Sequence, residues 1–177
     1  QIDFFHDGDK PPMSRYLFLV TAVGEGYGGL EHRASTALLC SRNDLPQKNQ
    51  KSISESYRNF LGLLSHEYFH TWNVKRILPA AFQPYDLARE NYTGLLWAME
   101  GITSYYDDLV LLRCGLITAE DYLQIIGETI TRVLRTPGRL KQSVAESSFD
   151  AWTKFYRPDE NSTNSGVSYY AKGSLVA

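Results

Sequence analysis

The hydrophobic and polar positions of this chain follow two different patterns, which meet near residue 45. Before that point, residues 16–23 and 34–40 are short apolar runs rich in residues that favour strands. The first run does not alternate between apolar and polar side chains, so it predicts a strand that is buried on both faces. We expect residues 1–23 to form sheet, and residues 1–45 as a whole to be a β-rich segment at the edge of a cleft, with the second strand at that edge.

Beyond residue 52 the apolar side chains recur at the spacing of helices. The capping-box pattern Ser52-Ile53-Ser54-Glu55 predicts the start of a first helix, which would carry residues 66–70 in its last turns. Its expected core face consists of Ile53, Tyr57, Phe60, Leu61 and Leu64. Further helices are predicted over 95–112, 118–135, 143–156 and from 168 onward, so residues 52–177 are expected to be mainly helical.

A glycine-rich segment, GEGYGGLEH, lies between the two predicted strands at residues 24–32. This composition favours a flexible loop. The simpler interpretation is a connection between two strands. The functional interpretation is that Gly28 and Gly29 let the backbone approach a ligand and present Glu31.

Composition and charge are those of a globular chain and exclude several functions. The 177 residues are 43% hydrophobic and 21% charged, with a net charge of −2 and a pI of about 6.1. This balance does not favour binding to nucleic acid or to an anionic membrane surface, and no apolar run reaches the length of a membrane span. Cys40 and Cys114 are too few for a disulfide framework, so they are either free thiols or one bridge, and the chain suits the cytoplasm or the periplasm equally.

The segment His66-Glu67-Tyr68-Phe69-His70 carries the candidate chemistry. On a helix the two histidine rings lie one turn apart, about 40° from each other around the axis, and Glu67 lies within about 100° of His66. Such a pair could also be structural, at the surface or at the edge of the core. Two imidazoles that hold one metal ion, with a carboxylate beside the remaining coordination position, are the arrangement of a zinc hydrolase.

Glu100 is a candidate for a third metal ligand. It lies in the predicted helix over 95–112, next to Trp97 and Met99. A carboxylate buried among apolar side chains needs a partner or a metal, because an isolated buried charge is costly. The alternative is an exposed glutamate on the helix surface. Gly101, the next residue, would allow close approach of another helix.

Four blocks of sequence in this order resemble the glycyl aminopeptidase family of zinc metallopeptidases. They are GGLEH, HEYFHTWNVKRILP, LWAMEGITSYYDD and GVSYYAKGSLVA. This family belongs to the thermolysin-like gluzincin clan, in which H-E-x-x-H supplies two metal ligands and a downstream glutamate supplies the third. The resemblance covers residues 16–177 and implies an α+β, thermolysin-like catalytic domain, with a short β segment before a helical bundle that carries the zinc site.

The resemblance also implies roles for the residues in these blocks. His66, His70 and Glu100 would bind Zn²⁺, and Glu67 would be the general base. The interval between His70 and Glu100 is longer than in thermolysin, although the W-x-x-E-G context around Glu100 matches the aminopeptidases of the clan.

Two further roles concern the substrate. Glu31 resembles the glutamate that binds the free amino group of the substrate in related aminopeptidases, although His32 stands where their motif has asparagine. Tyr170, in Y-A-K-G, resembles the tyrosine that stabilises the oxyanion, and Tyr169 is the rival for that role.

We therefore expect a zinc-dependent aminopeptidase that acts on peptides with a free N-terminus and a small first residue, Gly or Ala. The alternatives are an endopeptidase of the same clan, for which Glu31 would be only structural, and an inactive peptide-binding or scaffold module. Full-length members of the family carry an N-terminal β domain and usually a C-terminal PDZ-like domain. Residues 1–177 are expected to be part of the catalytic domain, without these flanking domains.

Overall fold

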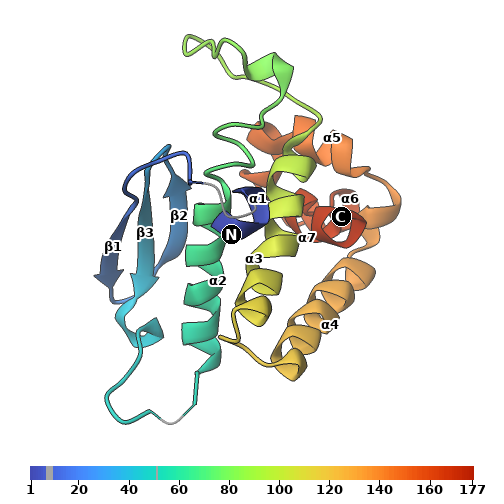
Figure 1. The fold of residues 1–177 in the computed structure, drawn as a ribbon. Coiled ribbons are helices and arrows are strands. Elements are labelled where there is room, and N and C mark those ends of the chain that lie inside the picture. The colour runs from blue at the N-terminus through green and yellow to red at the C-terminus, as the bar shows by residue number, and fades with distance from the viewer. Residues whose placement is uncertain (7–9, 51) are drawn as a thin grey trace. The chain divides into compact units, whose positions relative to one another are not determined.

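The computed structural model describes residues 1–6, 10–50 and 52–177 (Figure 1). The fold is α+β, with one small sheet and mostly helices, which confirms the fold class expected from the sequence at this level. None of the helices in the described part of the chain is long and apolar enough to cross a membrane. The chain is divided into two compact units, and each is described in turn.

The first unit consists of Gln1–Arg76 and Tyr106–Thr118. Its sheet contains strands β1 (Leu17–Val23), β2 (Tyr27–Glu31) and β3 (Ser35–Ser41), in the order β1-β3-β2 (Figure 1). Strand β3 is parallel to β1 and antiparallel to β2. The middle strand therefore has hydrogen-bonded neighbours on both sides.

Alternate side chains of β3 attach the sheet to helix α2 (Glu55–Phe69). Leu38 and Cys40 form a buried apolar cluster with Phe60 and Leu63 of the helix. Removing these side chains from water holds the helix on the sheet. The second cysteine, Cys114, is exposed, and both cysteines are free thiols.

One expectation about the sheet is wrong in its detail. The predicted loop over residues 24–32 forms strand β2 in its second half, because pairing with β3 satisfies the backbone groups and outweighs the poor strand preference of glycine. The predicted strand over 34–40 is confirmed as β3, the middle strand of the sheet.

The expectation that residues 16–23 are buried on both faces is also wrong. Phe18, Leu19 and Val20 are 45%, 53% and 44% exposed, because α2 packs mainly against β2 and β3, while from β1 the Phe18 ring lies 5.9 Å from that of Tyr68. Residues 1–23 are not all sheet either. Ile2–His6 forms helix α1, whose Phe5 ring stacks on Trp72, while residues 7–9 lie outside the described part.

Helix α2 begins two residues later than the capping-box pattern predicts. Its N-cap is Ser54, whose hydroxyl accepts a hydrogen bond from the backbone N–H of Tyr57 at 3.2 Å. Ile53 therefore lies before the helix and is 44% exposed, so it is not part of the core face. A 3₁₀ turn at Arg42–Asp44 precedes this region.

The second unit, Ile77–Tyr105 and Ala119–Ala177, is helical. Its elements are a π-helical turn at Trp97–Gly101, helices α4 (Ala119–Arg135) and α5 (Val144–Phe149), a π-helical turn at Ala151–Phe155, helices α6 (Ser162–Ser165) and α7 (Tyr169–Val176), and 3₁₀ turns at Ala80–Phe82 and Pro137–Leu140. Helix α3 (Ile102–Arg113) has residues 102–105 in this unit and the rest in the first.

The π-helical turns correct two predicted helices. The segments 95–112 and 143–156 are not continuous α-helices, since each contains a turn with one extra residue. Apolar periodicity does not distinguish such a turn from the α-helix around it.

Gly101 allows the close helix approach expected from the sequence, and its partner is helix α7. A Cβ atom at Gly101 would lie 2.6 Å from the Cα of Gly173. The π-helical turn that carries Glu100 is thereby packed directly on the helix that carries Tyr169 and Tyr170.

Two charged side chains of the first unit, one on helix α2 and one beside it, are largely shielded from water. Arg58 is 6% exposed, and the carboxylate of Asp108 lies beside Gly62 of the helix. Burial, and to a lesser extent the charge of neighbouring Asp107, raises the pKa of Asp108 to about 7 against the opposing charge of Arg58. The folded state therefore favours the neutral form of Asp108.

Replacing Gly101 by alanine should destabilise the chain by roughly 1–3 kcal/mol, because the added methyl group overlaps the backbone of Gly173. Gly127→Ala is the matched control. A Cβ at Gly127 meets nothing within 4 Å in helix α4, so this change should stabilise by about 0.5–1 kcal/mol. Urea unfolding measures both, and a Gly101→Ala chain as stable as the wild type would contradict the packing.

Asp108→Asn should become progressively more stabilising between pH 4 and pH 8. Because the pKa of Asp108 is raised in the folded state, the unfolded chain releases the proton first, and wild-type stability falls as pH rises through this window. A pKa change from 3.8 to about 7 corresponds to at most roughly 4 kcal/mol.

Thermal unfolding across this pH range tests the Asp108 prediction. The control is Glu90→Gln, which removes one exposed carboxylate and should give a curve parallel to the wild type. Parallel curves for Asp108→Asn and the wild type would contradict the prediction.

Candidate metal centre

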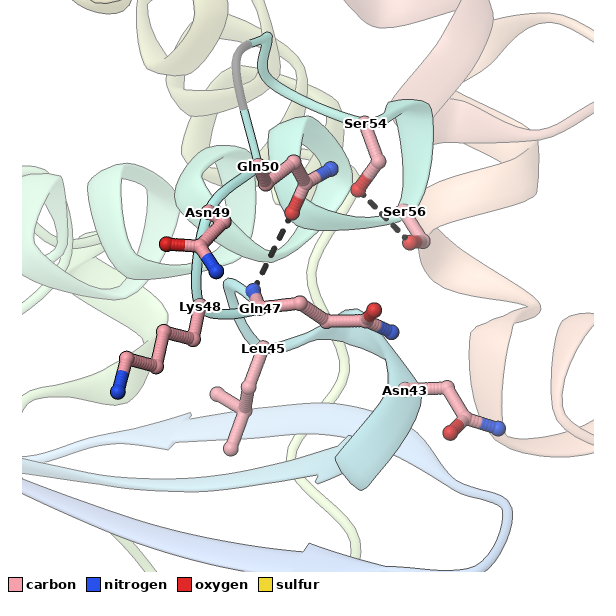
Figure 2. A pocket seen from close by; sticks show the side chains of 8 residues that line it. All are labelled: Asn43, Leu45, Gln47, Lys48, Asn49, Gln50, Ser54 and Ser56. Carbon is pink, nitrogen blue, oxygen red and sulfur yellow. Dashed lines mark hydrogen bonds between the residues drawn. The ribbon is translucent and has the colours of Figure 1, made fainter.

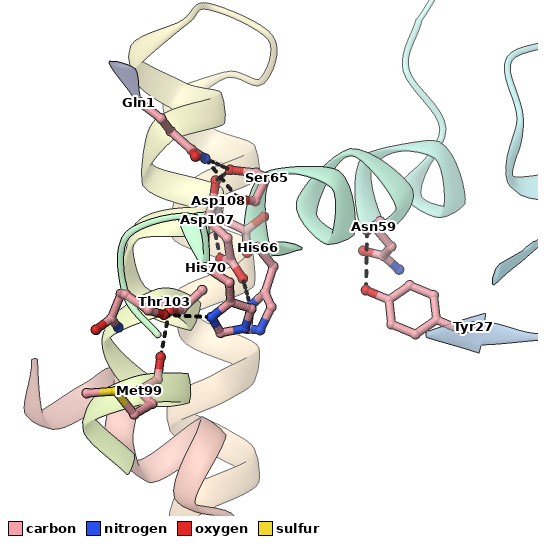
Figure 3. Close-up of polar contacts among 11 residues, drawn as sticks. Gln1, Tyr27, Asn59, Ser65, His66, His70, Met99, Thr103, Asp107 and Asp108 are labelled. Carbon is pink, nitrogen blue, oxygen red and sulfur yellow. Dashed lines mark hydrogen bonds and ion pairs between the residues drawn. The ribbon is translucent and has the colours of Figure 1, made fainter. Parts of the chain in front are cut away.

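The end of helix α2 brings the H-E-x-x-H residues together. His66 and Glu67 lie in its last turn, and His70 is its C-cap residue. The rings of His66 and His70 have their centroids 4.7 Å apart at an interplanar angle of 88° (Figure 3). The two imidazoles therefore lie on one side of the helix, as their spacing predicts.

Each histidine ring is held at its Nδ1 atom by a hydrogen-bond acceptor. His70 Nδ1 is 2.8 Å from the carbonyl oxygen of Asn73, and His66 Nδ1 is 3.0 Å from Oδ2 of Asp107. A carbonyl oxygen only accepts, so His70 Nδ1 carries the hydrogen, and a carboxylate at His66 favours the same tautomer. The lone pair of each ring is then on Nε2, which is the form that binds a metal.

The groups around Asp107 fix its carboxylate in place. The backbone N–H of Asp108 donates to Asp107 Oδ1 at 2.6 Å, and the hydroxyl of Ser65 donates to the Asp107 carbonyl at 2.7 Å. Gln1 in turn donates to the carbonyl and hydroxyl oxygens of Ser65, both at 2.9 Å. Burial raises the pKa of Asp107, while the hydrogen bond and charge of His66 lower it.

Sequence reasoning missed Asp107. The signal was available, since Asp107 is a carboxylate in the same apolar segment as Glu100, and the same argument about buried charge applies to it.

A compact turn after helix α2 fixes the position of His70. The backbone N–H of Lys75 donates to the carbonyl oxygen of His70 at 3.0 Å. The guanidinium of Arg76 donates to the carbonyl oxygens of Thr71 and Pro12. These bonds hold residues 70–76 in one conformation, and with them the Asn73 carbonyl that accepts from the His70 ring.

Strand β2 brings part of the glycine-rich segment to Glu67, which is 5% exposed. A Cβ atom at Gly29 would overlap the Glu67 carboxylate, so the backbone there lies against that carboxylate. Gly28 has nothing within 4 Å of its Cβ position and does not contribute to this contact. Ligand-type atoms of Glu31, Glu67 and His70 all lie within 4.8 Å of one another.

Glu31 also forms an ion pair. Lys75 Nζ lies 3.0 Å from Glu31 Oε1, and the two side chains are 24% and 21% exposed. The structure therefore gives Lys75 an acidic partner beside Glu67.

The other predicted site residues lie in the second unit. Glu100 is in the π-helical turn and contributes to raised pKa values of Tyr169 and Tyr170, for which burial is the larger cause. Tyr169 donates from its hydroxyl to that of Tyr156 at 3.1 Å, and the hydroxyls of Tyr156 and Tyr170 are 3.3 Å apart. Both tyrosines therefore keep their protons at neutral pH and can donate hydrogen bonds.

Two cavities away from these residues do not coincide with the predicted site. One, of about 430 Å³, is lined by Leu45 and by polar side chains of the segment before α2 and of the start of that helix (Figure 2). The other, of about 450 Å³, is lined by residues 132–168 of the second unit. Neither includes a residue predicted for catalysis, for metal binding or for substrate binding.

Comparisons with known proteins support the family that the sequence motifs resemble. Residues 59–176 match the family model of the M61 glycyl aminopeptidases. No curated protein sequence matches the chain. Among solved structures, the chain is similar to an aminopeptidase N family protein from Idiomarina loihiensis, with 52% sequence identity and a TM-score of 0.95.

The match to that structure covers 99% of this chain and 29% of the other, so the chain spans less than a third of the length of its solved relative. The family model covers more than half of the chain, and the matched residues include the H-E-x-x-H motif, Glu100 and Tyr170. On these grounds the chain belongs to the M61 glycyl aminopeptidase family.

Proposed function

We propose that this chain is the catalytic part of a zinc-dependent aminopeptidase, which removes small first residues, Gly or Ala, from peptides with a free N-terminus. The observation that carries the proposal is the pair of histidines whose Nδ1 atoms are both engaged by acceptors, next to the buried carboxylate of Glu67. Two nitrogen donors in the metal-binding tautomer beside a candidate base fit a zinc hydrolase.

His66 and His70 would hold the metal through Nε2, with Glu100 as the third protein ligand. Glu100 is proposed for this role because its W-x-x-E-G context matches the aminopeptidases of the clan. Three protein ligands leave a fourth position open for water. When bound, zinc would supply Lewis-acid polarisation of the scissile carbonyl and acidification of water.

Glu67 would act as the general base. Its carboxylate takes the proton of the attacking water and delivers it to the nitrogen of the leaving amine, so that one group serves both steps. The backbone at Gly29 lies against this carboxylate and restricts its rotamers, which supports a fixed position for the base.

Tyr170 would donate a hydrogen bond to the oxyanion that forms at the scissile carbonyl. Its raised pKa keeps the hydroxyl protonated and able to donate. Tyr169 is 1% exposed and already donates to Tyr156, which makes Tyr170 the better candidate of the two. A single donor of this type contributes roughly 2.7–4 kcal/mol in other hydrolases.

Glu31 would bind the substrate's N-terminal ammonium. One carboxylate oxygen of Glu31, one carboxylate oxygen of Glu67 and one ring nitrogen of His70 all lie within 4.8 Å of one another. An ammonium group held by Glu31 would therefore place the first peptide bond next to the base. The rival function is that of an endopeptidase. The ion pair of Glu31 with Lys75 is the observation that favours an endopeptidase, because a purely structural glutamate would also form it.

Cleavage of Gly-, Ala- and Leu-p-nitroanilides, each compared with its N-acetylated form, separates these functions. Hydrolysis of the unblocked Gly and Ala substrates alone supports the aminopeptidase. Equal hydrolysis of blocked peptides supports the endopeptidase, and zinc binding without any turnover supports the scaffold function.

Glu67→Gln should retain one zinc per chain. Its kcat should fall by roughly 10²-fold to 10⁴-fold, because the amide cannot accept the proton of water. Metal analysis and hydrolysis of Gly-p-nitroanilide on the same preparation measure both properties. Near-normal turnover in this variant would exclude Glu67 as the base.

Asp107→Asn should weaken zinc binding by roughly 10-fold to 100-fold, because the carboxylate that orients the His66 ring is lost. Competition with a chromophoric chelator gives the affinity. The matched control is Asp108→Asn, which changes the neighbouring carboxylate. Equal affinities of both variants and the wild type would mean that Asp107 does not support the metal ligand.

A further inference from the structure

Glu31 stands in a position where it could itself become a metal ligand. One carboxylate oxygen of Glu31, one of Glu67 and a ring nitrogen of His70 all lie within 4.8 Å of one another. Carboxylate oxygen and imidazole nitrogen are both zinc ligands. A metal held by His70 would therefore attract Glu31, and binding by Glu31 would fill the position that the attacking water needs.

The ammonium of Lys75 opposes this movement. It lies 3.0 Å from Glu31 Oε1, and both side chains are more than three-quarters buried, so the pair is less screened than one on the open surface. The ammonium neutralises much of the charge that a cation would otherwise attract. It engages one carboxylate oxygen, and the second remains for another cation.

The position of Lys75 is tied to the metal ligand itself. The backbone N–H of Lys75 donates to the His70 carbonyl, within the same turn whose Asn73 carbonyl accepts from the His70 ring. One short segment, residues 70–75, therefore sets the distance between His70 and Lys75, the partner of Glu31.

We propose that Lys75 is a positioning residue that keeps Glu31 off the metal and aimed at the ammonium of the substrate. The proposal rests on the proposed function in one respect, since it takes His66 and His70 as metal ligands. It adds that the ion pair of Glu31 with Lys75, and not Glu31 alone, keeps a coordination position open.

The variant Lys75→Met tests this inference, because methionine keeps the length and apolar stem of lysine and removes the charge. Released from Lys75, Glu31 should join the metal. The zinc dissociation constant should fall at least several-fold, and the absorption spectrum of the Co²⁺-substituted protein should change as a carboxylate oxygen replaces the coordinated water. For Gly-p-nitroanilide, KM should rise and kcat should fall.

Three further variants make the result specific. Lys75→Arg keeps a cation and should retain the Co²⁺ spectrum of the wild type. Lys48→Met removes an exposed lysine of the same unit and should change neither affinity nor spectrum. The double variant Glu31→Gln/Lys75→Met should return to the metal affinity of Glu31→Gln, because the amide is a poor zinc ligand.

An unchanged or weakened metal affinity in Lys75→Met, with an unchanged Co²⁺ spectrum, overturns the proposal even if the wild type is an active aminopeptidase. If the wild type binds metal but hydrolyses no substrate, while Lys75→Met still binds metal more tightly, the aminopeptidase proposal fails and the role of Lys75 stands. A wild-type chain that binds neither Zn²⁺ nor Co²⁺ overturns both.

Discussion

The hydrogen bonds at Nδ1 of two histidines hold the candidate metal-binding rings in one orientation. An imidazole that is free to rotate and change tautomer is a poor metal ligand, whereas His66 and His70 are each locked by an acceptor. The two acceptors come from different segments, the carboxylate of Asp107 and the main chain at Asn73. Helix α2 sets the spacing of the rings, and these acceptors set their orientation.

Charge balance is the second constraint on the site. One carboxylate oxygen of Glu31 and one of Glu67 lie within 4.8 Å of a ring nitrogen of His70, and Lys75 forms an ion pair with Glu31. The Glu67 carboxylate is confined by the backbone of Gly29, where any larger residue would overlap it. The two glutamates therefore have different surroundings, which supports different roles: one as a base and one as an anchor for an ammonium group.

Local periodicity explains which features were predictable from the sequence. The four-residue spacing of His66 and His70 predicted their common face, and the apolar run of β3 predicted a strand. The π-helical turn at Trp97–Gly101 was not predictable, because it preserves the apolar pattern. The partners Asp107 and Lys75 depend on contacts between distant segments, and the exposure of β1 depends on which strands α2 covers.

The most direct measurement is the anomalous diffraction of crystals of the zinc-loaded protein at the zinc absorption edge. The account predicts one zinc ion bound by Nε2 of His66, Nε2 of His70 and the carboxylate of Glu100, with Asp107 and Asn73 still bonded to the Nδ1 atoms and Glu31 outside the coordination sphere. Zinc bound through an Nδ1 atom, or through Glu31, would contradict it.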